Sequence, residues 1–163
     1  MGLQIERAHR FHRREMAAQR IGIAAVAVLL LAALLGTFGG GGPLNDTVQP
    51  APDGAFDLSY HRFLHRETSE RLTVSVAGSA VTSDHVDLEL AAGWLAQVQL
   101  SVVLPEPAAE TSTVDGVRFQ FAADPGTPLK VQFRFRADEV GVLDGWVRLV
   151  PGERVPLTQF VYP

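Results

Sequence analysis

The stretch "LKVQFRFR", residues 129–136, alternates apolar and polar side chains at every position. Its apolar members are Leu129, Val131, Phe133 and Phe135, and the four residues between and after them are charged or amide-bearing. Successive side chains of a β-strand point to opposite faces of a sheet, so strict alternation is typical of a strand with one buried face. The stretch therefore predicts a strand that packs its phenylalanines into a core.

The same alternation recurs before and after this strand, in segments separated by turn residues. The apolar faces fall within residues 56–64, 72–76, 86–90, 98–104, 117–121, 147–149 and 155–157. Asp115-Gly116 suits a tight hairpin between two of these segments. The connections are too short for helical crossovers, so the strands are expected to pair antiparallel. We predict an all-β fold at residues 56–163, an immunoglobulin-like antiparallel β-sandwich of seven to eight strands; an eight-stranded barrel is the alternative.

A different pattern precedes the strands. Residues 21–38 contain no charge, amide or proline, and Thr37 is their only polar side chain. As a helix this run measures about 27 Å, close to the hydrocarbon core of about 30 Å, and it is apolar on every side. A buried core helix and a cleavable signal peptide are the alternatives. The remaining chain is too small to surround such a helix, and no A-x-A-like cleavage site follows it. We therefore predict one N-terminal transmembrane helix at 21–38.

The charges on either side of this run predict its orientation. Residues 1–20 contain five arginines and two glutamates, and no basic residue follows the run closely. Under the positive-inside rule, 1–20 is a cytoplasmic basic segment and the domain after the span is periplasmic or cell-surface. The arginines either bind anionic lipid headgroups or serve only to set the orientation of the span. We assign membrane anchoring to Arg14, Arg20, Ile21, Leu30 and Phe38, and a Gly/Pro-rich tether to 39–55.

Composition excludes several classes of function. The chain has no cysteine, so disulfides, thiolate metal sites and thiol catalysis are ruled out. Residues 43–163 carry nine of the fourteen basic residues and sixteen of the eighteen acidic ones, so no nucleic-acid partner is expected. Ser79 lacks the G-x-S-x-G surroundings of a hydrolase nucleophile. We expect no cofactor and no catalytic residue.

Three histidines are the candidate metal ligands. His61 and His65 have the spacing of a helical metal pair, but on a strand they are about 13 Å apart. His85 precedes another strand and approaches them only if the tertiary structure brings it there. We therefore expect solvated histidines and no metal site, with His61, His65 and His85 kept as the alternative.

Aromatic residues are the candidate partner-binding residues. Trp94 is either a core residue or an exposed anchor. Phe160 and Tyr162 belong to the closing "TQFVYP", where Phe160, Val161 and Tyr162 are consecutive, so one face of that strand must leave apolar surface outward. Either a partner or the tether covers this surface.

Two resemblances complement the patterns. An inside N-terminus, one span and an outer immunoglobulin-like domain resemble the copper-delivery factors of cytochrome oxidase assembly, which carry a paired-cysteine motif. This chain has no cysteine, and Met1 and Met16 precede the span, so copper delivery is not supported. "YHRFLHRE" at 60–67 and "TQFVYP" at 158–163 are similar to small uncharacterised bacterial proteins with one N-terminal span, which implies a bacterial membrane location.

Together these features predict a non-enzymatic, membrane-anchored interaction or accessory module. Its expected partners are the lipid bilayer and a membrane or envelope protein. The alternative is an extracytoplasmic metal-handling protein or enzyme that uses His61, His65, His85 and nearby acids.

Overall fold

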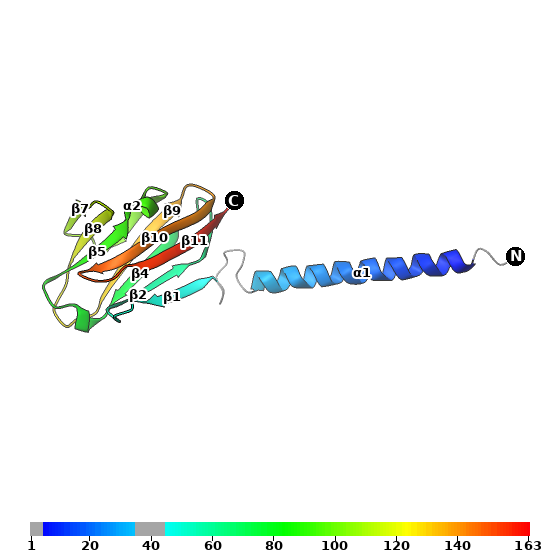
Figure 1. Cartoon of the computed structure of the whole chain (residues 1–163), viewed down its shortest axis with the longest axis horizontal. Coiled ribbons are helices and arrows are strands. Elements are labelled where there is room, and N and C mark those ends of the chain that lie inside the picture. The colour runs from blue at the N-terminus through cyan, green and yellow to red at the C-terminus, as the bar shows by residue number, and fades with distance from the viewer. Residues whose placement is uncertain (1–4, 35–44) are drawn as a thin grey trace.

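The computed structural model describes residues 5–34 and 45–163. Within 5–34 it describes the side chains of residues 19–31, 33 and 34. Residues 5–34 form one helix, α1 (Ile5–Leu34). The residues from 45 onward form eleven strands in two sheets, which confirms the predicted β-sandwich (Figure 1). Two short helical segments, η1 (Gly78–Ala80) and α2 (Ala92–Leu95), lie between strands.

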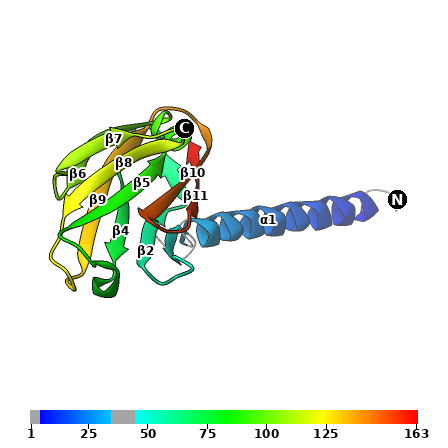
Figure 2. The ribbon, with the colours of Figure 1, turned by 60° about the vertical axis from the view of Figure 1, so that its left-hand side comes forward.

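The first sheet is antiparallel throughout. In spatial order its strands are β1 (Asp46–Pro50), β2 (Phe56–His61), β4 (Glu70–Val76), β9 (Leu129–Ala137) and β6 (Val98–Leu104). The second sheet is antiparallel except where β3 runs parallel to β11. Its order is β3 (Phe63–His65), β11 (Val155–Tyr162), β10 (Gly141–Val150), β5 (His85–Ala91), β8 (Gly116–Ala122) and β7 (Ala109–Ser112). Figure 2 shows the two layers from a second angle.

The predicted count of seven to eight strands is too low, because three strands carry little hydrophobic pattern. β1 has no buried residue and ends at a proline. It occupies 46–50, so the prediction of a tether there is wrong. β3 has only three residues, and all of β7 is exposed. A strand that buries no alternate face leaves no period-two signal in the sequence.

The core lies between the sheets and contains most of the predicted apolar faces. In β6 the prediction is wrong beyond Leu100, because the register shift between Leu100 and Val102 leaves Val102 and Leu104 41% and 47% exposed. Phe133 and Phe135 of β9 are fully buried. Phe133 meets Phe119 and Phe121 of the opposite sheet edge-to-face, with ring centroids 5.5 and 6.3 Å apart. Edge-to-face pairs place the positive rim of one ring against the negative face of another, which adds to the gain from burial.

Trp94 of α2 is part of this core, so of its two predicted alternatives the structure has the core residue and not the exposed partner-binding anchor. Its side chain is 1% exposed, and its indole packs on Phe135 with centroids 4.9 Å apart. The backbone of Gly145 on β10 leaves the room for it, since a Cβ there would lie 2.6 Å from the Trp94 Cβ. A glycine on a strand far along the chain thus decides the burial of this tryptophan.

A buried glutamine joins the two sheets beside Trp94. The Trp94 Nε1–H donates to Gln159 Oε1 at 3.1 Å, and Gln159 Nε2 donates to the backbone carbonyl of His61 at 2.9 Å. Gln159 belongs to β11 and His61 to β2, so this amide connects opposite layers. Both ends of the buried amide have partners, which offsets the cost of removing it from water.

The described part of α1 exposes its apolar side chains. From Ile21 to Leu34 the large apolar residues are between 55% and 77% exposed. Arg20, Ile21 and Leu30 of the predicted anchor lie in this helix with exposed side chains, and Arg14 lies nearer its start. Phe38 and the tether residues 39–44 lie outside the described residues. In the described ranges no helix meets the length and apolarity that a membrane crossing requires.

Replacing Gly145 with alanine tests the packing of Trp94. The added Cβ meets the indole side chain, so Gly145→Ala is expected to lower the free energy of unfolding by about 1–3 kcal/mol. Gly93→Ala is the matched control, because a Cβ there meets no atom within 4 Å. Urea unfolding of the full chain in mild detergent, followed by tryptophan fluorescence, measures both. Equal stability of the two variants would contradict the packing described.

Candidate functional site

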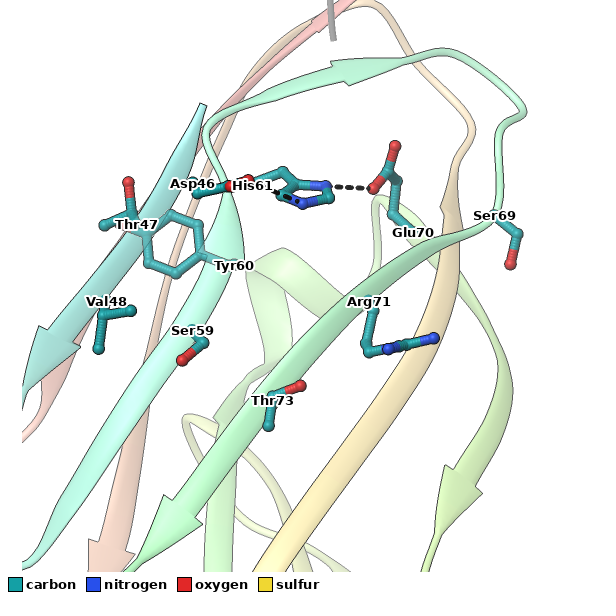
Figure 3. Close-up of a pocket in the computed structure, with 10 residues that line it drawn as sticks. All are labelled: Asp46, Thr47, Val48, Ser59, Tyr60, His61, Ser69, Glu70, Arg71 and Thr73. Carbon is teal, nitrogen blue, oxygen red and sulfur yellow. Dashed lines mark hydrogen bonds and ion pairs between the residues drawn. The ribbon is translucent and has the colours of Figure 1, made fainter. Parts of the chain in front are cut away.

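The first candidate site is a groove at the β1 edge of the first sheet, which we call the His61 groove (Figure 3). Its volume is about 400 Å³. Most of its lining residues are of polar type and come from β1, β2 and β4. The lining comprises Asp46, Thr47, Val48, Ser59, Tyr60, His61, Ser69, Glu70, Arg71 and Thr73. The antiparallel register places Asp46 opposite His61 and so brings a carboxylate to the imidazole.

His61 lies between two carboxylates in this groove. Its Nδ1 is 3.0 Å from Glu70 Oε2, and its Nε2 is 3.2 Å from Asp46 Oδ1. The side chain thereby ties β2 to β1 on one side and to β4 on the other. Its first role is to hold three strands in place.

This geometry does not suit a metal ion. The two carboxylates approach opposite nitrogens of the ring, so they cannot share one ion with it. Within 45–163 and the described part of α1, no group of three or more His, Asp or Glu side chains is placed to hold a metal.

The other two candidate histidines lie apart from the groove. His65 Nδ1 is 3.0 Å from the Arg66 carbonyl oxygen, and its ring meets Tyr162 edge-on. His85 is the first residue of β5, at the end of the second sheet where β10 finishes. Its Nδ1 is 2.7 Å from Asp84 Oδ1. The hydrogen bond to Asp84 raises the pKa of His85 above its ordinary value. The fold therefore does not bring His61, His65 and His85 together.

A nucleophile–base pair is also missing from the described residues of the His61 groove. Ser59 and Thr73 are cross-strand neighbours in the groove, and Ser69 lies at its rim. Both nitrogens of the His61 ring face carboxylates, and among the described residues no hydroxyl bonds to the ring. Nucleophilic catalysis requires a hydroxyl or thiol held against a base.

A second candidate is the carboxylate of Glu89, which is fully buried on the outer face of the second sheet. Register places it between Arg148 of β10 and Arg118 of β8. Arg148 Nη2 and Nε donate to Oε2 at 2.6 and 2.8 Å, and the Thr113 hydroxyl donates to Oε1 at 2.6 Å. Burial alone raises the pKa of Glu89, but these hydrogen bonds and the two arginine charges outweigh it and lower the pKa. A carboxylate held in this way stabilises the packing of neighbouring strands and is not free to act as a base.

The third candidate, which we call the edge groove, lies between β6 of the first sheet and β7–β8 of the second. Its volume is about 420 Å³. The lining is mostly apolar and comprises Leu95, Val98, Leu100, Ser101, Val102, Val103, Glu110, Val117 and Phe119. Val102 and the neighbouring Leu104 are 41% and 47% exposed. Sequence reasoning assigned 98–104 to a strand but missed the groove, because its other wall comes from residues that only the fold brings near.

The fourth candidate is an apolar patch at the start of β10 and the end of β11. Val140 is 49% exposed, Val142 55% and Phe160 45%, and Val142 and Phe160 are direct cross-strand partners. Half-buried Phe63 of β3 lies opposite Phe160. We call Val140, Val142 and Phe160, with Phe63 beside them, the tether-proximal patch. Sequence reasoning found Phe160 but missed the valines.

Tyr162 differs from Phe160, although both were predicted to bind a partner. Its ring is half-buried and its hydroxyl is buried without a hydrogen-bond partner among the described residues. Burial raises the pKa of Tyr162, and the charge of Glu70 adds to the effect. The hydroxyl is therefore directed into the protein.

A zinc titration tests the metal-handling alternative. Because the His61 ring is held on both sides by carboxylates of its own sheet, calorimetry of the full chain in mild detergent is expected to give the same zinc isotherm as a variant with His61→Ala, His65→Ala and His85→Ala. Stoichiometric binding that the triple substitution abolishes would overturn this interpretation of the histidines.

Removing one member of the buried ion pair tests the structural role of Glu89. Arg148→Met leaves the carboxylate buried with its strongest donor gone, so it is expected to lower the free energy of unfolding at pH 7 by about 3–5 kcal/mol. The Glu89→Met/Arg148→Met double variant removes the stranded charge and is expected to lose less stability.

The ion pair also predicts a pH dependence. The pKa of Glu89 is depressed in the folded state, so the contribution of its carboxylate to stability is present at neutral pH and is lost as pH falls through that pKa. Urea unfolding at pH 7 and pH 4 measures both effects, and a double variant less stable than Arg148→Met would contradict the structural role of Glu89.

Comparisons with known proteins add no functional assignment. No protein-family model matches the chain, and no curated protein matches it. Function is therefore inferred from the geometry of the four candidate surfaces.

Proposed function

We propose that the chain is a non-enzymatic interaction module, an immunoglobulin-like β-sandwich held outside a membrane by a helix at 21–38, which binds a membrane or envelope protein. Two mainly antiparallel sheets packed face to face support the immunoglobulin-like assignment. The proposal has two parts, an anchor and a docking surface.

The anchor is supported by the chemistry of α1 and the segment after it. Its large apolar side chains are exposed from Ile21 to Leu34, so this surface needs an apolar environment. The apolar run continues to Phe38. Five arginines precede it and favour an N-terminus in the cytoplasm. The sandwich then lies on the other side of the membrane.

The edge groove is the observation that carries the docking surface. β6 is the last strand of its sheet, so its outer backbone groups are not paired to another described strand. A free strand edge beside apolar pockets is the arrangement that accepts an extended segment of another protein, with backbone hydrogen bonds giving affinity and alternate side chains giving specificity. The register shift between Leu100 and Val102 limits indiscriminate pairing at this edge. The groove thus favours a protein partner with an apolar extended segment.

The other candidates support this choice over an enzyme or a metal-handling protein. In the His61 groove, the His61 ring contacts Glu70 through a hydrogen bond and Asp46 through an ion-pair contact, so its two nitrogens face carboxylates of its own sheet. The carboxylate of Glu89 is occupied by Arg148 and Thr113. Reactive groups need free lone pairs or protons at the surface, and these side chains are engaged in holding strands together.

Site-specific photo-cross-linking tests the docking surface. A benzophenone amino acid in place of Val102 is expected to capture one discrete protein in native membranes. The same residue in place of Val48 is the matched control, because Val48 is 66% exposed on β1, the opposite edge of the same sheet. Capture at Val102 that Leu100→Glu abolishes supports the proposal. Equal capture at both positions, or none at Val102, would contradict it.

A further inference from the structure

We propose that the tether-proximal patch rests on the outer surface of the lipid bilayer, as a second membrane contact of the chain. This inference rests on the anchor in the proposed function and names the occupant of a surface that the edge groove does not use. It assigns Val140, Val142 and Phe160 to the interface between lipid and water. This differs from the prediction from sequence, in which Phe160 contacts a protein partner.

The patch lies where the sandwich receives the chain from the predicted span. Arg62 N–H donates to the Asn45 carbonyl at 2.9 Å, and Phe63 N–H donates to Asn45 Oδ1 at 2.8 Å. Phe160 N–H in turn donates to the Arg62 carbonyl at 2.7 Å. Asn45, the first described residue of the sandwich, is fully buried. A short series of hydrogen bonds therefore fixes the patch next to the point of entry.

The length of the intervening chain limits how far this point is from the membrane. The predicted span ends at Phe38, and residues 39–44 are the only ones between it and Asn45. Seven residue steps span at most about 25 Å when fully extended. The headgroup layer occupies part of that distance, since a bilayer is about 10–15 Å thicker in all than its hydrocarbon core. A lipid surface is thus within reach of the patch whenever the anchor is inserted.

The charges around the patch are mixed and do not select anionic headgroups. Arg62 and Arg66 are exposed on the β3 side, and Arg66 pairs with Glu67 at 3.2 Å. Asp138 and Glu139 are exposed in the turn before Val140. Acidic and basic side chains are therefore mixed, and the apolar side chains supply the attraction. Shallow insertion of apolar side chains between headgroups is how interfacial segments bind membranes.

Single-cysteine labelling of the full chain tests the proposal. The native sequence has no cysteine, so each introduced thiol carries the only label. We would reconstitute Val142→Cys and Phe160→Cys, labelled with a polarity-sensitive nitrobenzoxadiazole dye, in phosphatidylcholine vesicles with and without doxyl-labelled lipid. Val114→Cys is the control, because Val114 is fully exposed at the β7–β8 hairpin, away from the patch. The proposal predicts blue-shifted emission and at least twofold stronger doxyl quenching at 142 and 160 than at 114.

The remaining outcomes overturn the proposal in distinguishable ways. If the dye at positions 142 and 160 emits at the same wavelength as the water-exposed dye at position 114, a lipid contact in vesicles is excluded. If those positions become shielded only in native membranes, the occupant is a protein. Blue-shifted emission without doxyl quenching means that the chain itself covers the patch. If the protein does not float with vesicles on a density gradient, the anchor of the proposed function fails first. Circular dichroism of each labelled variant checks that the strands are retained.

Discussion

The amide of Gln159 is the interaction on which much of this architecture depends. A two-sheet sandwich without cysteines has no disulfide between its layers, so their relative position rests on packing and on the few polar groups buried between them. Gln159 accepts from the Trp94 indole and donates to the His61 carbonyl, which joins α2, β11 and β2. Because a buried amide is costly unless both of its ends are satisfied, competing alignments of the two layers are disfavoured. Gly145 is the steric counterpart, since it gives Trp94 the space that this alignment needs.

The same end of the sandwich carries the His61 ring and the tether-proximal patch. The end of β2, the short β3 and the end of β11 meet there, and Asn45 links them to the segment that leads to the predicted span. Polar residues that resembled a site in the sequence hold these elements together, as His61 does between Asp46 and Glu70. The two surfaces that we propose for partners are lined mostly by apolar residues. One is the edge groove along β6, and the other is the patch around Val142 and Phe160.

The sequence predicted the elements whose burial alternates and missed the features that depend on register. Residues 129–136 alternate strictly and form β9, whereas β1 and β7 bury no alternate face and left no pattern. The predicted spacing of about 13 Å between His61 and His65 assumed a single strand, whereas the two histidines end β2 and β3, which belong to different sheets. The contacts of His61 with Asp46 and Glu70 could not be predicted, because they join strands whose pairing the local sequence does not specify. Trp94 could not be assigned to the core from its surroundings, since Gly145 lies on another strand. Gln159 resembles a surface residue in an alternating strand until Trp94 and His61 are placed around it.

The most direct measurement of the central claim is the compartment that the sandwich occupies. Val114→Cys in the full chain places one thiol on a fully exposed hairpin, and Ala8→Cys places one before the predicted span. Intact cells expressing each variant are treated with a membrane-impermeant maleimide and then separated into soluble and alkali-washed membrane fractions. The account predicts that the chain stays in the washed membranes, that position 114 is labelled in intact cells, and that position 8 is labelled only after lysis. Recovery of the chain in the soluble fraction, or labelling at 114 that requires lysis, would contradict it.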